Sequence, residues 1–304
     1  NIFAINLTVP KINIIYILIY YIIILMVYKF HFKYAIFLIV LTIVYKIQPY
    51  LDPNSYLYFL DVGQGDSSVI VGNNLNYAIM IDTGGLISYE KESWQKRNKT
   101  FDNANNIITF LKSIGISKLD LLIGTHGDID HIGYADQIIN EIKVKNVWLN
   151  NNETNDLEKN ILSKINKNNF TKLRILNLNN TIVEDENESS LVLYFKIDQV
   201  NVLMMGDAPK RIEKEISEQY DFPVDILKVG HHGSKTSTDK SFVEKYQPKY
   251  AIISSGRNNR YNHPSIETIE TLQEFNIPYY NTQDRGTIVY TIKDQIKKVN
   301  FFPP

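Results

Sequence analysis

The chain has no cysteine and only six histidines among its 304 residues. The absence of cysteine excludes a disulfide framework and any thiolate metal site. A bound metal would need imidazole and carboxylate ligands, which suit zinc, manganese or iron better than a soft metal. The absence of cysteine does not discriminate between an oxidising and a reducing compartment.

Acidic residues are absent from the first 51 positions, which contain four lysines. The rest of the chain carries 28 basic and 33 acidic side chains, a net formal charge of −5. Contacts between basic side chains and phosphates provide most of the non-specific affinity for nucleic acid. We therefore do not expect this part to bind nucleic acid tightly, although a bound divalent metal would reverse the sign locally. The negative charge does not exclude nucleic acid as a substrate.

The first 51 residues are almost entirely apolar, in runs at 12–28 and 34–50. The first run has about the length of a membrane-spanning helix, and its tyrosines are typical of membrane interfaces. The second run contains Lys46, whose ammonium can extend toward water at an interface. No short charged start or small-residue cleavage site marks a signal peptide. These features predict a transmembrane helical hairpin at residues 1–51, with a pair of buried core helices as the alternative.

The connection between the two apolar runs is basic, with Lys29, His31 and Lys33. Basic loops favour the cytoplasmic side of a membrane. We therefore expect residues 52–304 to lie outside the cytoplasm, attached to the cell membrane. Because the chain begins with Asn1 rather than methionine, we expect it to be part of a larger membrane protein with further segments upstream.

Residues 52–304 have the pattern of a second domain, in which short strands alternate with helices. Turn residues bound the predicted strands, and the arrangement suggests two sheets flanked by helices. The polar segment 86–100 predicts a surface loop, and residues 283–288 predict a tight turn. Strands are predicted at 56–62, 67–71, 77–82, 119–124, 173–178, 190–196, 201–206, 224–230, 250–255 and 286–292, and helices at 101–115, 131–143, 156–168, 209–219, 240–246 and 265–275.

Two histidines and two aspartates occupy six positions directly after the apolar run LDLLIG. Because they follow a predicted strand and precede a predicted helix, we expect them to project from one edge of a sheet. Imidazole and carboxylate are suitable ligands for zinc or manganese. The alternative is a loop of capping aspartates and surface histidines. The four residues are His126, Asp128, Asp130 and His131.

Two later strands also end in residues that can bind a metal. NVLMMGD ends at Asp207, whose carboxylate could bridge two ions, and VDILKVGHHGS contains His231 and His232. Three strand ends of this kind are what a binuclear site at a sheet edge requires. A bound metal lowers the pKa of water from 15.7 to roughly 7, so the residues predict metal-assisted hydrolysis. Asp130 is the natural group to orient the attacking water.

Two loops beside these ligands offer groups suited to phosphate. Ser234, Lys235 and Thr236 follow the histidine pair directly, and Ser255 and Arg257 follow the predicted strand 250–255. Hydroxyl, backbone N–H and cationic groups all bind phosphate oxygens. The alternative for the first loop is a turn that caps the helix near residue 240, with Ser237 or Thr238 as the N-cap, and both roles can hold together.

His263 could protonate a leaving oxygen or grip a phosphate. Its alternative is a residue at the start of the next helix. The glycine-rich segment FLDVGQGD contains neither G-x-G-x-x-G nor a Walker lysine, so no nucleotide cofactor is expected.

Six motifs, taken in order, resemble the metallo-β-lactamase-fold domain of ComEC-type competence proteins. The resemblance covers about residues 56–292, and the apolar segment before it matches the membrane helices that precede this domain in the family. It implies an α+β fold, a four-layer αββα sandwich, for residues 52–304. The motifs are FLDVGQGD, IDTGG, THGDIDHIGY, MMGDA, KVGHHGSKTSTD and SSGRNNRYNHPS.

The resemblance also implies two metal sites. Asp130, His131, Asp207 and one of His231 and His232 would hold one ion, whereas His126, Asp128 and the bridging Asp207 would hold the other. Most relatives have histidine at the position of Asp128 and a further histidine before the GD strand, yet residues 132–230 contain none. We therefore expect one tight ion, Zn²⁺ or Mn²⁺, and a second site that is weak or absent.

In this fold the glycine turns lie beneath the metal loop. We therefore expect Asp82 to support the metal ligands from the second shell of contacts. For Asp66 a structural and a functional role are both open.

The function implied by the resemblance is metal-dependent phosphodiester hydrolysis, as a nuclease acting on DNA during uptake through a competence membrane channel. Asp130 and His263 would be catalytic, and the rest of the channel and other competence proteins would be partners. One alternative is a hydrolase of cell-wall or lipid phosphodiesters, which the acidic domain suits slightly better. The other is a catalytically inactive, metal-stabilised gating or docking domain, which the missing histidine favours.

Overall fold

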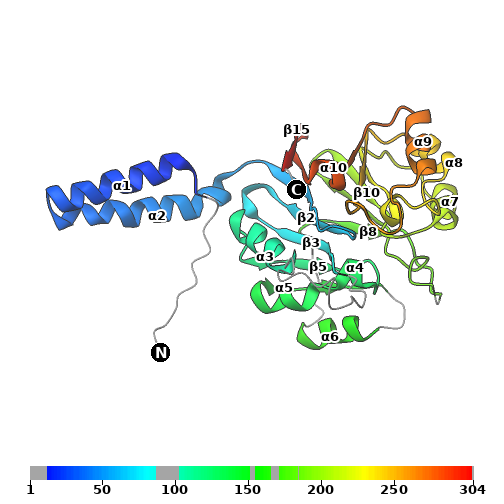
Figure 1. The fold of residues 1–304 in the computed structure, drawn as a ribbon, viewed down its shortest axis with the longest axis horizontal. Helices are drawn as coiled ribbons and strands as arrows, with labels where there is room; N and C mark the ends of the chain where they lie inside the picture. Colours follow the sequence, from blue (N-terminus) through cyan, green and yellow to red (C-terminus); the bar gives the residue numbers. More distant parts are fainter. Residues whose placement is uncertain (1–11, 87–102, 151–154, 166–170, 184, 303–304) are drawn as a thin grey trace, which may run out of the picture.

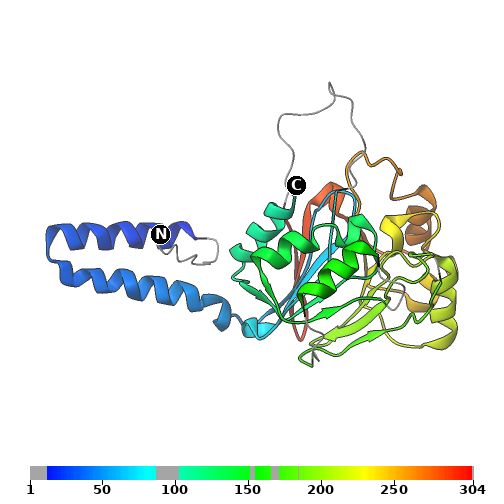
Figure 2. The ribbon, with the colours of Figure 1, turned by 90° about the horizontal axis from the view of Figure 1, so that it is seen from below.

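Two β-sheets pack face to face, with helices over both outer faces and a pair of apolar helices at one end (Figures 1 and 2). The computed structural model describes residues 12–86, 103–150, 155–165, 171–183 and 185–302. The four-layer αββα sandwich predicted from the sequence is confirmed.

The first sheet has seven strands in the order β15-β14-β1-β2-β3-β5-β7, and the second has six in the order β13-β12-β11-β10-β9-β8. A small parallel pair, β4 (Lys118–Leu119) and β6 (Lys143–Val144), lies beside them. The first sheet comprises β1 (Ser55–Phe59), β2 (Ser67–Val71), β3 (Ala78–Thr83), β5 (Leu121–Ile123), β7 (Val147–Trp148), β14 (Thr287–Lys293) and β15 (Gln295–Phe302); the second comprises β8 (Ile175–Asn177), β9 (Leu193–Ile197), β10 (Val200–Met204), β11 (Ile226–Lys228), β12 (Tyr250–Ile253) and β13 (Tyr279–Asn281).

The central core lies between the two sheets and follows the two-residue period of the strands. Leu57 and Phe59 of β1 are fully buried in one cluster with Phe195 of β9 and Val202 of β10. Tyr58, between the first two, points to the opposite face and packs on the helices there. Each fully buried aliphatic or aromatic side chain contributes about 1.5–3 kcal/mol.

Three main helices cover each outer face of the sandwich, and each buries an apolar stripe (Figure 1). In α7, for example, Ile212 and Ile216 lie one turn apart on the buried side. Side-chain caps begin several helices: Asn155 for α6, Asp239 for α8 and Ser265 for α9. The six helices are α3 (Asn103–Ser113), α5 (Ala135–Glu141) and α6 (Asp156–Lys164) on the first sheet, and α7 (Lys210–Gln219), α8 (Lys240–Tyr246) and α9 (Ile266–Glu274) on the second.

Two predicted elements differ in the structure. The helix expected at 131–143 is split into α4 (Ile129–Ile132) and α5, because the N–H of Tyr134 donates to the carbonyl of Gly84 at 3.0 Å and the carbonyl of Asp130 accepts from Asp66 N at 3.1 Å, in place of the helical bond between them. The tight turn expected at 283–288 is a short helix, α10 (Thr282–Arg285), followed by Gly286 at φ 69°. Apart from residue 86, the predicted loop 86–100 lies outside the described residues.

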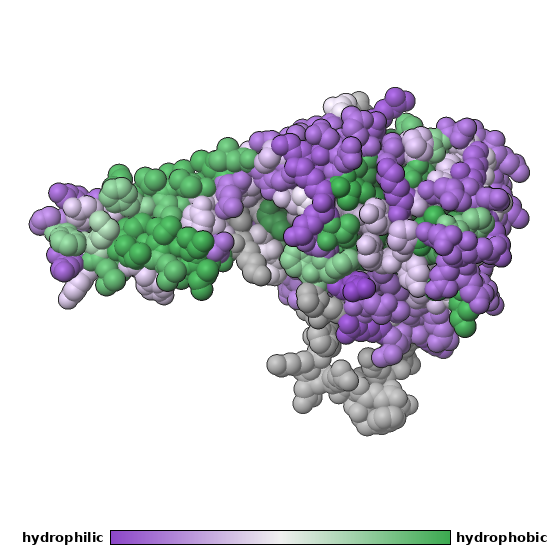
Figure 3. All heavy atoms as spheres, turned by 90° about the horizontal axis from the view of Figure 1, so that it is seen from above, coloured by the Kyte–Doolittle hydropathy of each residue, from purple (hydrophilic) through white to green (hydrophobic). Residues whose placement is uncertain are grey.

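The N-terminal apolar runs form α1 (Ile14–Lys29) and α2 (Ile36–Ile47), which lie side by side and project away from the sandwich (Figure 2). Their surface is apolar and largely exposed (Figure 3), so the alternative of two buried core helices is wrong. By length and composition, the helical segment Phe32–Leu51 can cross a membrane, whereas α1 is shorter. The membrane hairpin and the domain border at residue 51 stay predictions.

The connection from these helices to the sandwich is short and well bonded. Only Asp52–Asn54 separate the 3₁₀ turn η2 (Gln48–Leu51) from β1. The Oδ1 atom of Asp52 accepts hydrogen bonds from Asn54 N at 3.0 Å and Asn54 Nδ2 at 2.7 Å, and its Oδ2 accepts one from Tyr56 Oη at 2.6 Å. This linker is therefore fixed by its own side chains.

Candidate metal centre

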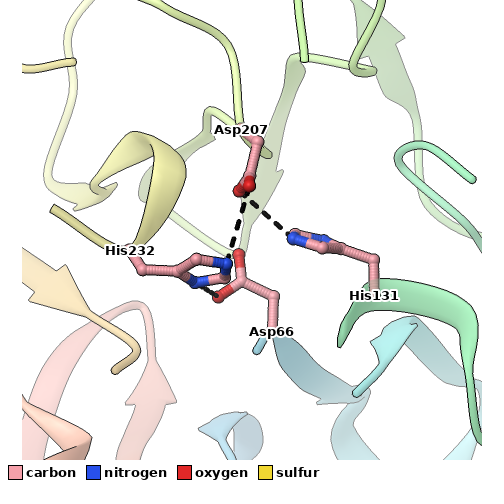
Figure 4. A group of neighbouring side chains, drawn as sticks. All are labelled: Asp66, His131, Asp207 and His232. Atoms are coloured by element: carbon pink, nitrogen blue, oxygen red, sulfur yellow. Dashed lines mark ion pairs between the residues drawn. The ribbon is translucent and has the colours of Figure 1, made fainter. Parts of the chain in front are cut away.

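The three strand ends that the sequence pattern predicted meet at one edge of the sandwich. The THGDIDH loop follows β5, Asp207 follows β10, and the histidine pair lies in a 3₁₀ turn after β11. Asp66, just before β2, joins them. Four buried residues offer ligand atoms that all lie within 4.8 Å of one another (Figure 4): Asp66, His131, Asp207 and His232.

Asp207 is the centre of this cluster. Its Oδ1 lies 3.2 Å from His131 Nε2, and its Oδ2 lies 3.5 Å from His232 Nε2. His232 Nε2 is also 3.3 Å from Oδ2 of Asp130. The structure therefore brings together the first predicted ligand set, and the member of the histidine pair that it buries there is His232.

The second predicted set lies on the other side of Asp207. His126 Nε2 is 3.6 Å from Asp128 Oδ2 and 4.0 Å from Asp207 Oδ2, and His231 Nε2 is 3.8 Å from the same Asp207 oxygen. His126 is buried, but the side chain of Asp128 is half exposed. The ligand atoms of this group lie farther apart and are more exposed to solvent than those of the first group, which is consistent with a weaker second metal site.

Several ligand atoms are buried without a hydrogen-bond partner among the described residues. They are Nε2 of His126, His131 and His232, and Oδ1 of Asp66 and Asp207. A buried unsatisfied polar group costs about 1–3 kcal/mol, so these atoms favour a further partner; four of them lie in the tight cluster and Nε2 of His126 lies in the wider group. Three imidazole nitrogens and carboxylate oxygens form a donor set that suits a divalent ion such as Zn²⁺ or Mn²⁺. The residues therefore fit a divalent metal.

Asp82 supports the cluster from behind, as expected from its glycine turn. It has φ 55° at the end of β3. Its Oδ1 accepts the backbone N–H of Thr125 at 2.8 Å, and its Oδ2 accepts the Thr125 hydroxyl at 2.8 Å and lies 3.0 Å from His131 Nδ1. Because Nδ1 is held by Asp82, Nε2 of His131 is the atom that faces Asp207.

Lys228 is a feature of the site that the sequence did not reveal. It is 2% exposed, and its Nζ donates to Asp66 Oδ2 at 2.7 Å. The other oxygen of Asp66 lies 3.3 Å from Nδ1 of His232, which also lies 3.1 Å from the carbonyl of Ser254. The only signal was a lysine inside the apolar strand ILKVG, where a charge must be paired to be buried.

The ionisation of the cluster is set by burial and by opposite charge. Burial alone would lower the pKa of His131, but Asp207 and Asp82 outweigh it and raise that pKa well above its ordinary value. For the same reason the pKa of His232 rises to about 10, with Asp207 and Asp66 as the main opposing charges. His232 and His131 in turn outweigh burial at Asp207 and hold its pKa well below the usual range. Protons and a divalent cation therefore compete for this site.

Metal binding should release protons at neutral pH. His232 and His131 carry raised pKa values in the metal-free chain, so they must lose protons when Nε2 becomes a ligand, and affinity should rise with pH up to about 10. The expected slope is roughly a tenfold gain per pH unit for each proton released. Titration calorimetry with Mn²⁺ or Zn²⁺ in buffers of different ionisation enthalpy measures this number. Identical heats in all buffers would contradict the prediction.

The five predicted phosphate-binding residues are placed differently from one another. Lys235 and Thr236 are exposed, and the Thr236 hydroxyl lies 3.2 Å from Nδ1 of His231. Ser234 is buried, and its Oγ accepts hydrogen bonds from the N–H and hydroxyl of Thr236. The alternative for this loop is wrong in its capping residue, because the N-cap of α8 is Asp239 rather than Ser237 or Thr238.

Ser255 and Arg257 are directed elsewhere. The Ser255 side chain is fully buried and donates to Asn281 Oδ1 at 2.9 Å, because the neighbouring strand β13 lies beside it. Arg257 donates from Nε to the carbonyl of Gln283 at 2.6 Å, which turns it toward α10. The structure does not bring these two residues into the cluster.

His263 is next to the histidine pair, with its ring centroid 5.7 Å from that of His231 and 6.4 Å from that of His232. Burial, and then the charges of His232 and His231, lower its pKa to about 4. The imidazole is therefore neutral at pH 7. A neutral ring can donate a hydrogen bond to a phosphate, but it is a poor proton donor to a leaving group, so gripping is the better supported of its two predicted roles.

The fold and this cluster define a class of protein. Residues 60–257 match the family model described as the metallo-beta-lactamase superfamily, and the chain belongs to this superfamily, whose members are generally metal-dependent hydrolases. It is similar to "ComE operon protein 3" of Bacillus subtilis (strain 168), with 34% identity over 276 residues, 85% of this chain and 36% of that protein. It is also similar to "Recombination protein 2" of Haemophilus influenzae, with 31% identity over 80% of this chain and 28% of that protein.

These similarities confirm the resemblance to ComEC-type competence proteins. The chain spans about a third of the length of the curated relatives it matches. Among solved structures, it resembles the metallo-β-lactamase fold protein YhfI from Bacillus subtilis, with 11% identity, coverage of 78% of this chain and 100% of that chain, and a TM-score of 0.48.

Proposed function

We propose that this chain is a metal-dependent phosphodiester hydrolase, a nuclease that cleaves DNA during uptake through a competence membrane channel. The observation that supports it most is the convergence of three unpartnered imidazole nitrogens on the carboxylate of Asp207. The exposed Lys235 and Thr236 beside His231 offer contacts for phosphate oxygens. Similarity to proteins named for competence and recombination supports DNA as the substrate.

Each residue has a part in this proposal. Asp130, His131, Asp207 and His232 would hold the tighter ion, and Asp207 would share its second oxygen with His126, Asp128 and His231. A bound divalent ion supplies positive charge opposite the phosphoryl oxygens and makes water a nucleophile at neutral pH. Asp130 orients the attacking water and accepts its proton, Asp82 keeps the His131 ring in place, and His263 donates a hydrogen bond to the phosphate.

The membrane context belongs to the same proposal. The apolar helices α1 and α2 would anchor the sandwich to the cell membrane, with residues 52–304 outside the cytoplasm and the rest of the channel upstream. The exposed apolar surface of these helices supports an anchor, and the basic connection between them supports this orientation. Other competence proteins would be partners of the complete channel.

Hydrolysis of end-labelled single- and double-stranded DNA by the detergent-solubilised chain tests the proposal. With Mn²⁺ or Zn²⁺ we expect cleavage that a chelator stops. The substitution Asp130→Asn keeps the shape of the side chain but removes the charge that orients water, so we expect a loss of roughly 10²–10⁴-fold in kcat. Asp156→Asn, the same change at a fully exposed side chain in the first turn of α6, serves as the matched control.

Absence of cleavage by a folded, metal-loaded chain would contradict the nuclease. Small choline and glycerol phosphodiesters are then the next substrates, because the net charge of −5 over residues 52–304 suits them better than DNA. Metal binding with no turnover of either substrate would favour the gating or docking function.

A further inference from the structure

A column of aromatic rings leads from the metal cluster to the surface. The His263 ring stacks on that of His232, with centroids 6.4 Å apart and planes at 29°, and Tyr261 stacks on His263 at 5.6 Å and 25°. His232 is 2% exposed, whereas Tyr261 is 48% exposed. The column therefore connects a buried candidate ligand with an aromatic surface that solvent can reach.

The loop that carries Tyr261 is closed by Asn259. The Asn259 Nδ2 donates to the carbonyls of Gly256 at 2.9 Å and His263 at 2.5 Å, and its Oδ1 accepts the His263 N–H at 2.9 Å. These bonds join the two ends of the loop, and Tyr261 lies between them. The backbone on both sides of Tyr261 is thus ordered before any ligand arrives, so little ordering of the loop is needed on binding.

Both ends of this loop also pack tightly against other loops of the site. A Cβ on Gly256 would lie 2.6 Å from the backbone N of Gln64, and a Cβ on Gly233 would lie 2.8 Å from Cβ of Pro264. The first contact joins the loop to the GQGD turn and the second joins it to the histidine turn. The ends of the loop that carries Tyr261 are thus packed directly against two turns of the candidate metal centre.

We propose that Tyr261 is a stacking platform for a nucleobase of the substrate strand, beside the phosphodiester that the metal cluster holds. This rests on the proposed nuclease function and narrows its substrate to strands with unpaired bases. A planar aromatic ring stacks on any of the four bases, because every base offers a π-face. In a duplex both faces of a base are covered by its neighbours, so a single strand or a frayed end is preferred.

The test compares Tyr261→Ala and Tyr261→Phe on two single-stranded oligonucleotides of equal length, one with all its bases and one with abasic sugars throughout. Base stacking typically contributes roughly 5- to 150-fold. We expect the unmodified chain to favour the strand with bases by this factor, in kcat/KM with Mn²⁺ and in dissociation constant by fluorescence anisotropy. Tyr261→Ala should remove that preference, and Tyr261→Phe should keep it.

Tyr50→Ala is the matched control, because Tyr50 is 50% exposed but lies at the helical end of the molecule. It should leave both strands unaffected. Equal effects of Tyr261→Ala on both strands would overturn the platform and assign the tyrosine to loop structure, and no effect on either would overturn it too. Unmodified chain that cleaves the two strands equally well contradicts the platform alone, whereas metal-loaded chain that cleaves neither contradicts the nuclease.

Discussion

Replacing Asp207 by alanine is expected to abolish tight metal binding and to lower hydrolysis on the order of 10³-fold or more, because even the loss of one preorganised oxyanion-hole donor costs an enzyme about 10²–10³-fold in kcat. Four of the five histidines in residues 52–304 approach this one carboxylate to within 4.0 Å. Each of the other candidate ligands lies close to fewer candidate ligands than Asp207 does. Loss of Asp207 therefore removes the group common to both ligand sets.

Metal content by elemental mass spectrometry and DNA cleavage, measured on the same preparation, test this expectation. Asp156→Ala is the control, because Asp156 is an aspartate with a fully exposed side chain in the first turn of α6. Circular dichroism shows whether the Asp207→Ala chain is folded. A folded variant that keeps its metal and its rate would overturn the assignment of Asp207 as the shared ligand.

The second large effect concerns stability, at the buried pair formed by Lys228 and Asp66. Removing one partner of a buried ion pair leaves an uncompensated charge and costs about 3–5 kcal/mol. We therefore expect Lys228→Met to lower the free energy of unfolding of the metal-free chain by about that amount. At about 2–4 °C per kcal/mol for a domain of this size, Tm should fall by roughly 6–20 °C.

The pH dependence of this loss follows from the carboxyl group. Burial works to raise the pKa of Asp66, but Lys228 and His232 outweigh it and hold that pKa below its ordinary value. A depressed pKa contributes stability at pH above the ordinary value near 4, and this stability is lost as the pH falls below it. Without Lys228 the pKa of Asp66 should rise, so the deficit of Lys228→Met should be largest at neutral pH and shrink in acid.

The double variant Lys228→Met with Asp66→Asn serves as the control, because it removes both charges together. Replacing both members of a buried pair is often close to neutral, so most of the lost stability should return. Denaturant unfolding at pH 7 is measured for the unmodified chain, the single variants Lys228→Met and Asp66→Asn, and the double variant. Together these four values give the coupling energy between the two residues. Strictly additive losses would show that the two residues act independently.

Much of the site was predictable because its ligands follow apolar strands directly in the sequence. His126, Asp130 and Asp207 come three to seven residues after a strand, and the carboxyl ends of neighbouring strands meet at one sheet edge. The contacts with Lys228 were not predictable, because its partner Asp66 is 162 positions away and belongs to the other sheet. A lysine inside an apolar run gives no direction in which to search for its carboxylate.

The predicted phosphate-binding residues that lie outside the cluster have a similar explanation. Ser255 follows a strand as the ligands do, but its side-chain direction depends on Asn281, which lies on a neighbouring strand that the sequence did not predict. That strand, β13, has only three residues after Pro278. Another unpredicted strand, β15, is an edge strand whose mostly exposed side chains lack the alternation of a half-buried strand.

The short linker at Asp52–Asn54 determines how much room the metal centre has to move. A long flexible tether would let an anchored enzyme sample a wide volume and would dilute its active site within that volume. Here only three residues separate η2 from β1, and hydrogen bonds to Asp52 hold them, so the sandwich can rotate very little relative to η2. If α2 anchors the chain in a membrane as proposed, the edge that carries the metal cluster would lie at one height and one tilt above the lipid surface. Under the proposed function, the site would then act only on the part of a DNA strand that passes at this fixed distance from the membrane anchor.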